Sequence, residues 1–145
     1  AINNLRSEAE KRNVDKNRLI FAKDIPRSQH FARHSLGDLG LDTFAFNGCS
    51  TSTFGLWAGM PILTKIGESF AARFTASLLH SLGVPELITY SEKEYEEKAL
   101  NIANNPNELI KLKSKLAKSR AISPLYNSEL FTRDLERKFK ELAEN

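Results

Sequence analysis

The segment DTFAFNGCSTS, residues 42–52, contains residue types that could bind an anion. A short apolar run ends in an acid, and a run of small polar residues, GCST at 48–51, follows it. Glycine allows backbone N–H groups to approach a ligand closely, and Ser and Thr hydroxyls add hydrogen-bond donors. A helix that begins here would add about half an elementary positive charge at its N-terminus. The segment therefore predicts a phosphate-binding loop that opens a helix.

Plainer interpretations of this segment stay open. Gly, Ser and Thr also occur at many strand-to-helix turns that bind nothing, and the segment matches neither GxGxxG nor the P-loop pattern with its lysine. Cys49 could be a nucleophile, because a helix N-terminus favours a thiolate, or it could be an inert small residue.

A second candidate segment follows Pro26 and contains Arg27, His30 and Arg33. His30 and Arg33 are three residues apart, so they would share one face of a short helix and, with Arg27, could hold an anion or stack on a base. Ordinary surface polarity explains the trio equally well. His30 and His34 have the i, i+4 spacing of metal-binding helices, but no carboxylate or third histidine lies at a useful spacing, so we expect no metal site.

A third candidate segment is GESFAAR, residues 67–73. We expect Glu68 to lie in a loop before a helix and Arg73 to lie one turn inside that helix. Glu68 could accept a hydrogen bond from a ligand hydroxyl, or it could only place a favourable negative charge at the helix N-terminus.

The elements that must position these segments alternate between strand and helix through the first ninety residues. Short apolar runs bounded by turn residues predict buried strands at 18–22, 39–43, 61–64 and 86–89. Periodicity, caps and prolines predict helices at 3–12, 28–34, 50–58, 70–82, 91–104, 107–120 and 127–143, the third of them capped by the Ser and Thr residues at 50–52. This alternation predicts an α/β doubly wound, Rossmann-like parallel sheet. Ligands of such sheets lie outside the carboxyl ends of the strands, where we expect the loops 23–28, 44–52 and 65–69.

Composition and charge exclude several classes of protein. The chain has 145 residues, of which 41% are hydrophobic, enough for one domain with a core. Its net charge of +3 comes from Lys and Arg interspersed with Asp and Glu, so we expect no nucleic-acid partner. The apolar runs are far shorter than the roughly 18 residues of a membrane span, and the single cysteine allows no internal disulfide. We therefore expect a cytoplasmic protein without a membrane contact.

Taken together, these segments resemble the C-terminal part of the catalytic region of the O-linked N-acetylglucosamine transferase family, glycosyltransferase family 41, including bacterial relatives that carry tetratricopeptide repeats. The resemblance runs from about Leu5 to Phe139. Its most specific combination is LWAGxP followed by GExxxxR and later by SPL[FY][ND], which stand here as LWAGMP, GESFAAR and SPLYN.

The resemblance implies a GT-B architecture, in which two Rossmann-like lobes hold a nucleotide-sugar in the cleft between them. Residues 1–145 would then be a nucleotide-sugar-binding C-terminal lobe without its opening strands, α/β over about 1–90 and helical over about 91–145. We therefore expect a fragment of a longer protein, which begins here without a methionine. The N-terminal catalytic lobe and tetratricopeptide repeats would be its partners from outside this chain.

By position, the resemblance assigns nucleotide binding to Arg27, His30, Arg33, Cys49, Ser50, Thr51 and Phe54, with Glu68 and Arg73 in support. Two of these residues depart from the family pattern. Cys49 stands where members usually have a histidine that donates to the diphosphate, and a thiol is a weak donor. Phe54 stands where they usually have an acid near the ribose, and it cannot accept a hydrogen bond. The sugar and the nucleotide are therefore left open.

For the parent protein the resemblance implies inverting transfer from a UDP-sugar, such as UDP-GlcNAc, to a Ser or Thr hydroxyl of an acceptor protein, without a further cofactor. The family's candidate base and phosphate-binding lysine fall outside this chain, so the catalytic residues stay unassigned and we expect no transferase activity from the isolated chain. The alternative is a non-catalytic nucleotide-binding or protein-interaction module derived from the same fold. The chain could also self-associate through an amphipathic helix at 127–143.

Overall fold

The computed structural model of the protein describes residues 1–144. These residues form two compact units, Ala1–His30 and the remainder of the described chain from Phe31 onward. Each unit is described by itself.

The first unit contains the helix α1 (Ile2–Lys11) and the short 3-10 helix η1 (Lys16–Arg18). Between them, Asn13 adopts a left-handed conformation with φ 57°, which ends α1, and the Asp15 carboxylate accepts a hydrogen bond from the N–H of Asn17 at 2.9 Å. The helix prediction for 3–12 is confirmed.

The strand predicted at 18–22 is wrong. Residues 19–26 have no regular secondary structure, and Ile20 is 89% exposed. A strand exists only where a neighbouring strand pairs with its backbone groups, and none of the described residues pairs with this segment. The loop 23–28 is therefore not a connection from a strand into a helix.

The second unit is built on a three-stranded parallel sheet in the order β1 (Gly40–Leu41), β2 (Ile62–Lys65) and β3 (Ile88–Thr89). The predicted strands at 39–43, 61–64 and 86–89 are confirmed in position, although β1 and β3 are only two residues long. All pairs are parallel, as predicted for alternating strands and helices. The central strand is buried on both faces, which explains its continuous apolar run.

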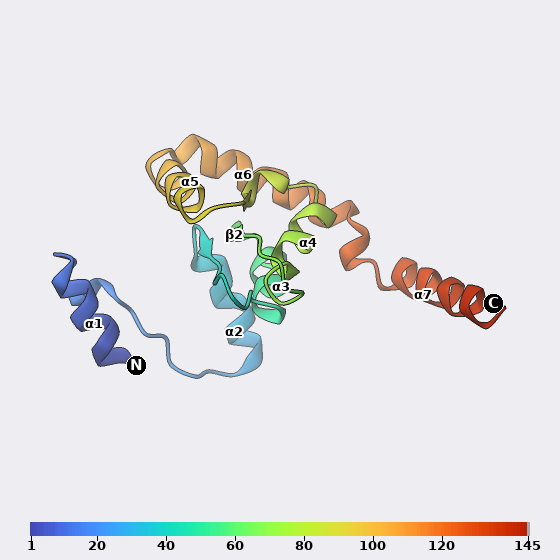
Figure 1. Cartoon of the computed structure of the whole chain (residues 1–145), viewed down its shortest axis with the longest axis horizontal. Helices are drawn as coiled ribbons and strands as arrows, with labels where there is room; N and C mark the ends of the chain where they lie inside the picture. The colour runs from blue at the N-terminus through green and yellow to red at the C-terminus, as the bar shows by residue number, and fades with distance from the viewer. Residues whose placement is uncertain (145) are drawn as a thin grey trace. The chain divides into compact units, whose positions relative to one another are not determined.

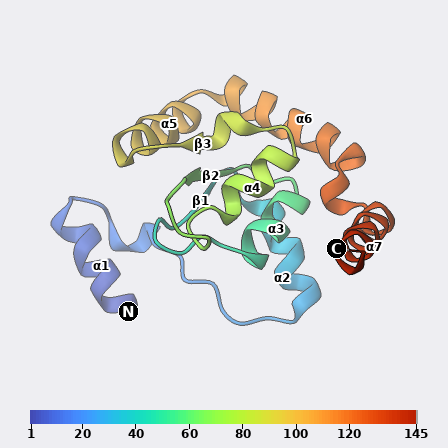
Figure 2. The same ribbon diagram turned by 45° about the vertical axis from the view of Figure 1, so that its right-hand side comes forward.

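Helices α3 (Ser50–Trp57) and α4 (Phe74–Ser81) form the two crossovers of this sheet (Figure 1). They contact each other and both contact β2, whereas α5 (Glu92–Asn104) contacts β2 and β3 (Figure 2). Two consecutive right-handed crossovers in one direction place their helices on the same face of a sheet. The core between these layers consists of leucine, isoleucine and valine side chains, among them Leu56, Leu63, Leu79, Leu82 and Val84.

The helical part after β3 also follows the prediction. It comprises α5, α6 (Pro106–Ile122), the 3-10 turn η4 (Pro124–Tyr126) and α7 (Ser128–Ala143). Three further helices lie before β3 in the chain: α2 (Arg27–Arg33), η2 (His34–Leu36) and η3 (Pro85–Leu87). Side-chain oxygens of Ser91, Asn105 and Asn127 accept from backbone N–H groups three residues ahead and so cap α5, α6 and α7.

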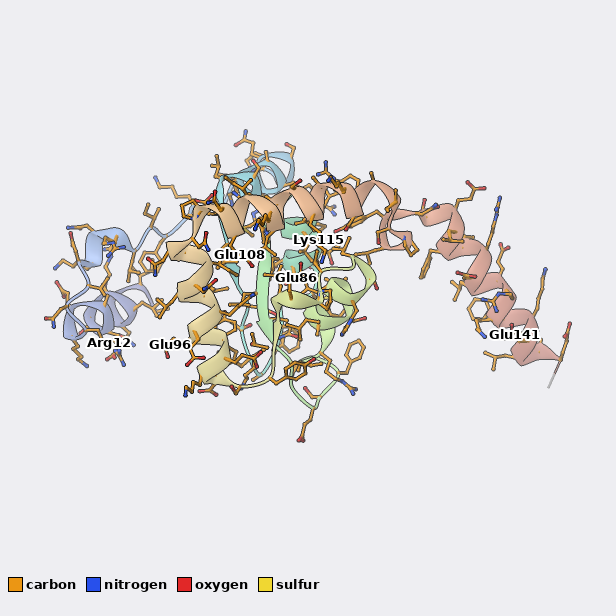
Figure 3. All side chains as sticks on the ribbon, turned by 90° about the horizontal axis from the view of Figure 1, so that it is seen from above. Arg12, Glu86, Glu96, Glu108, Lys115 and Glu141 are labelled. Atoms are coloured by element: carbon orange, nitrogen blue, oxygen red, sulfur yellow. The ribbon has the colours of Figure 1, made fainter. Side chains whose placement is uncertain are left out.

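Ion pairs tie the helical part to the sheet. Lys115 of α6 and Glu86 of η3 lie side by side in Figure 3, and the Lys115 ammonium donates to the Glu86 carboxylate at 2.7 Å. Both side chains are partly exposed, so this pair contributes at most about 1 kcal/mol.

Helix α7 contacts η4 and buries none of its side chains. Its apolar residues are exposed, including Phe131 at 64% and Phe139 at 62%. Among residues 1–144, no helix has both the length and the apolar character needed to cross a membrane.

Candidate functional site

The carboxylate of Asp42 organises the loop between β1 and α3. Its Oδ1 accepts from the backbone N–H groups of Thr43 at 2.9 Å and Gly48 at 2.8 Å, and its Oδ2 accepts from the Thr64 hydroxyl of β2 at 2.8 Å. The hydroxyl of Tyr95 on α5 donates to the Asp42 carbonyl oxygen at 3.1 Å. The acid that follows β1 therefore fixes the path of the loop.

The side chain of Asn47 joins the same loop to α4. It is 1% exposed; its Nδ2 donates to the Thr43 carbonyl at 2.7 Å, and its Oδ1 accepts from the N–H of Thr75 at 3.4 Å. The Asn47 N–H donates to the Ala71 carbonyl at 2.9 Å. Through its side chain and its backbone N–H, this one buried residue thus connects the loop to α4 and to the turn before α4.

Helix α3 begins at Ser50, and its N-cap is Cys49, so the predicted capping by the residues at 50–52 is wrong. Ser52 is instead buried, and its hydroxyl oxygen lies 3.1 Å from the Thr75 hydroxyl, which donates to it. Within the described chain, no side-chain hydrogen bond caps α3 at Cys49. The first N–H groups of a helix have no partner inside it, so this end is suited to an external acceptor.

Gly48 is required by the close approach of this turn to α3. A Cβ atom at this position would lie 2.6 Å from the Ser52 hydroxyl oxygen and 3.4 Å from the Ser52 nitrogen. The small residue is therefore explained by packing within the turn, and its predicted role in letting backbone N–H groups approach a ligand stays a prediction.

A hollow of about 290 Å³ opens beside this turn, at the carboxyl end of β1. Its lining combines backbone and hydroxyl groups of the loop with apolar side chains below them: Leu41, Asp42, Thr43, Gly48, Thr51, Ser52, Met60 and Ile62. Pockets for small ligands span about 300–1,000 Å³, so this hollow lies at the lower limit of that range.

Cys49 is exposed at the N-cap of α3, and Ser50 and Thr51 are exposed in its first turn. Thr51 also lines the hollow. Phe54 lies one turn further along the helix. Its ring stacks on that of Phe31, with centroids 4.3 Å apart and planes inclined by 54°.

The two stacked rings border a second hollow of about 290 Å³, which Thr53, Trp57 and Tyr126 complete. The rings of Trp57 and Tyr126 pack edge to face, with their centroids 4.8 Å apart. The pKa of Tyr126 is raised to about 12, because the effect of burial exceeds the opposing effect of the nearby Arg120 charge. Phe54 therefore belongs to an aromatic cluster and not to a polar site.

Arg33, near the start of the second unit, ends α2 and is half-buried. Arg27 and His30 lie on the same helix but belong to the first unit. Their convergence with the turn at Ser50 stays a prediction.

The prediction for 67–73 is corrected in two respects, one for Arg73 and one for Glu68. Helix α4 begins at Phe74, not at residue 70, so Arg73 is its N-cap and does not lie one turn inside it. The N–H of Gly67 donates to the Ala72 carbonyl at 2.8 Å, which closes residues 67–72 into a compact turn. Glu68 is exposed in this turn and lies outside the first turn of α4, so its interpretation as a charge at that helix terminus is wrong.

Sequence reasoning missed Asn47, Thr64 and Thr75, whose side chains hold the turn in place. Asp42 was noticed only as the end of an apolar run. The sequence did carry a signal for Asp42 and Asn47. Asp42 is an acid that ends a strand, and Asn47 and Gly48 form an Asn-Gly pair one residue before a helix.

The second unit has the form of a Rossmann-like lobe, with a polar loop that enters a helix at the carboxyl edge of a parallel sheet. A family model described as Glycosyl transferase family 41 matches residues 2–135, and the chain belongs to this family. The resemblance drawn from the sequence is confirmed.

Two relatives and one solved structure show how far the similarity extends. The chain is 32% identical over 132 residues to a UDP-N-acetylglucosamine--peptide N-acetylglucosaminyltransferase of Caenorhabditis elegans, covering 91% of this chain and 12% of that protein. It is 36% identical over 135 residues to the probable UDP-N-acetylglucosamine--peptide N-acetylglucosaminyltransferase SEC of Arabidopsis thaliana, covering 92% and 14%. The K341M mutant of the Thermobaculum terrenum O-GlcNAc transferase superposes with a TM-score of 0.89 at 31% identity.

That superposition covers 97% of this chain and 27% of the Thermobaculum chain. It confirms the predicted fold, an α/β lobe of a GT-B glycosyltransferase with a helical C-terminal part. The chain spans only a small part of the length of each relative.

Proposed function

We propose that the chain is the UDP-sugar-binding lobe of an inverting protein O-glycosyltransferase, which transfers N-acetylglucosamine from UDP-GlcNAc to Ser or Thr residues. The observation that carries this proposal is the N-terminus of α3, which no side chain of residues 1–144 caps and which lies beside a hollow of about 290 Å³. The relatives named above are transferases of this type, which supports the choice of donor and acceptor.

The chain's own contribution would be stabilisation of the leaving group. As the acceptor hydroxyl oxygen bonds to the anomeric carbon, the bond from that carbon to the diphosphate oxygen breaks and negative charge grows on UDP. Backbone N–H groups and hydroxyls at Ser50 and Thr51, together with the dipole of α3, are suited to oppose this charge without a metal. Arg27, His30 and Arg33 would bind the nucleotide, with Glu68 and Arg73 in support.

The residues at 49 and 54 set limits on the donor. A thiol at Cys49 donates weakly to a diphosphate. The Phe54 ring packs against the Phe31 ring and has no atom that could accept a hydrogen bond from a ribose hydroxyl. An unpaired hydroxyl costs about 1–3 kcal/mol, so we expect weaker donor binding than in relatives with an acid at this position.

The remaining parts of the enzyme would come from outside this chain. We propose that the rest of the catalytic region supplies the base and the acceptor cleft, that tetratricopeptide repeats accompany it, and that the protein acts in the cytoplasm without a further cofactor. The isolated chain should show no turnover of UDP-GlcNAc with peptide.

The second candidate function is a non-catalytic nucleotide-binding or protein-interaction module. The aromatic packing of Phe54 favours it, because this packing replaces a polar contact with an apolar cluster.

Calorimetric titration of the 145-residue chain tests the first proposal. UDP and UDP-GlcNAc should bind saturably, whereas GDP-mannose and inorganic phosphate should bind at least about tenfold more weakly. Replacing Ser50 and Thr51 by alanine together should weaken UDP binding about tenfold, since two hydrogen bonds to a charged group are lost. Thr132→Ala on α7, which also removes an exposed hydroxyl, is the matched control. Absence of saturable nucleotide binding would favour the interaction module.

A further inference from the structure

The hollow beside Phe54, here called the aromatic hollow, is walled mainly by rings. Four of its five lining residues are aromatic and the fifth is a threonine: Phe31, Thr53, Phe54, Trp57 and Tyr126. The rings support one another in two pairs, Phe31 with Phe54 and Trp57 with Tyr126, whose centroids lie 4.3 Å and 4.8 Å apart. The hollow therefore presents ring surfaces in a fixed arrangement.

Arg120 of α6 holds Trp57 at the rim of the aromatic hollow. Its guanidinium lies 5.3 Å from the centroid of the Trp57 ring and donates to the Trp57 carbonyl oxygen. Trp57 is nevertheless 52% exposed. A ring that is already held in place loses little conformational freedom when a ligand packs on it, so it is suited to binding.

The aromatic hollow lies on the same side of α3 as Ser50, at which the proposed diphosphate site begins. Ser50, Phe54 and Trp57 stand at positions i, i+4 and i+7, so they share one face of the helix. Phe54 is four residues beyond Ser50, which corresponds to about 6 Å along the helix axis. A phosphate group bound at the first turn of α3 would therefore have the aromatic hollow one turn further along the same face.

A nucleotide carries a flat ring at a comparable remove from its phosphates, since the ribose separates the base from the first phosphate group. Bases stack on aromatic side chains, and every base has a π-face that can do so. We propose that the base of the donor nucleotide lies in the aromatic hollow, against Phe54 and Trp57. This inference rests on the proposed function, and it gives the Phe54 ring a role in donor binding: stacking would offset the ribose hydrogen bond that this ring cannot accept.

The donor's sugar is the competing occupant, because it is attached to the other end of the same diphosphate. A sugar ring carries several hydroxyls that need polar partners. The polar side chains that line the aromatic hollow are Thr53 and Tyr126, and the Tyr126 hydroxyl already donates to the Thr53 carbonyl at 3.4 Å. This lining favours the base.

The fluorescence of Trp57 tests the proposal, because it is the only tryptophan of the 145-residue sequence. Titration of the complete chain with UDP should quench its emission saturably, whereas inorganic pyrophosphate should not. Dihydrouridine diphosphate keeps the phosphates, the ribose and the polar edge of the base, but its saturated ring is not flat. It should bind at least about fivefold more weakly than UDP in calorimetry and should not quench Trp57.

Variants of Phe54 separate stacking from a general loss of structure. Phe54→Leu should weaken UDP binding about fivefold and leave the affinity for dihydrouridine diphosphate unchanged, whereas Phe54→Tyr, which keeps a ring, should bind UDP like the unmodified chain. Phe139→Leu on α7 is the matched control, since it removes a ring that is 62% exposed outside the aromatic hollow. It should leave both affinities unchanged.

Several outcomes would overturn the inference. They are equal affinities for UDP and dihydrouridine diphosphate, or an equal loss of UDP affinity in Phe54→Leu and Phe139→Leu. Quenching by UDP-GlcNAc but not by UDP would overturn it in favour of the sugar. Saturable UDP binding without any change in Trp57 emission would overturn it and leave the proposed function standing, whereas absence of UDP binding would overturn both.

Discussion

The two strand-to-helix connections of the sheet solve the same geometric problem in different ways. The loop from β1 into α3 is held by its own Asp42 carboxylate and by groups of other elements, namely the hydroxyl of Thr64, the N–H of Thr75 and the hydroxyl of Tyr95. The loop from β2 into α4 is closed by its own backbone, through the bond from Gly67 to Ala72. Neither helix has a side-chain cap.

A helix N-terminus therefore does not by itself distinguish the two loops. The first has small polar residues beside a hollow, whereas the second leads through a turn that presents Phe70 and Glu68 to solvent. Both loops already use backbone N–H groups, those of Thr43, Asn47 and Gly48 in the first and that of Gly67 in the second. The first loop differs in the hydroxyl-bearing residues Ser50 and Thr51, which are exposed at the start of α3.

The largest expected effect is a loss of stability when the hydrogen bonds between the first loop and α4 are removed. Asn47→Ala removes two side-chain hydrogen bonds, one to the Thr43 carbonyl and one from the N–H of the buried Thr75, and leaves a space where the buried amide was. We expect a loss of about 3 kcal/mol in the free energy of unfolding, measured by urea denaturation. Asn101→Ala on α5, where the side chain is exposed, should change it by less than about 0.5 kcal/mol. Equal losses of stability in Asn47→Ala and Asn101→Ala would show that the Asn47 side chain does not hold the loop in place.

The next effect separates the two loops by function. Gly48→Ala and Gly67→Ala both force a Cβ atom to within 3 Å of a neighbour, the Ser52 hydroxyl oxygen in the first case and the Ala72 Cβ in the second. Each should cost about 1–3 kcal/mol of stability. Only Gly48→Ala should also weaken UDP binding in calorimetry at a temperature where both variants are folded. A similar loss of UDP affinity in Gly67→Ala would contradict the assignment of the ligand to the first loop.

A smaller effect concerns the tyrosine that supports the first loop at high pH. Burial, and then the charge of Asp42, raise the pKa of Tyr95 to about 12. Because the folded protein favours the protonated phenol, this contribution to stability is complete below pH 10 and is lost as the pH rises towards 12. The urea midpoint should therefore fall between pH 10 and 12, and Tyr95→Phe should reduce that fall. Tyr90→Phe, at a residue that is 72% exposed, should leave the fall unchanged.

The smallest effect belongs to the loop from β2 into α4, which its own backbone closes. The Ser69 hydroxyl oxygen accepts from the Ala72 N–H at 3.2 Å, alongside the backbone bond of Gly67. Ser69→Ala should cost about 0.5–1 kcal/mol in urea denaturation, with no change in UDP affinity. A loss above about 2 kcal/mol would mean that this loop depends on side chains as much as the first does.

Much of the fold could be predicted because its signals are local. The buried run Ile62–Lys65, the caps at Ser91, Asn105 and Asn127, and the prolines at 106 and 124 each specify an element within a few residues. The segment 18–22 carries a similar apolar signal, yet it is not a strand, because pairing depends on a partner that a local pattern cannot reveal.

The candidate site divides in the same way. The types and order of the residues at 48–51, together with the family motifs, determined that a small polar turn opens α3 and that the chain belongs to glycosyltransferase family 41. Only the tertiary structure decided that Ser52 is buried against Thr75, that Asn47 bridges the turn to α4, and that Phe54 stacks on Phe31. Residue order limits which backbone shapes are accessible, but a side chain finds its partner only when segments more than twenty residues apart pack against each other.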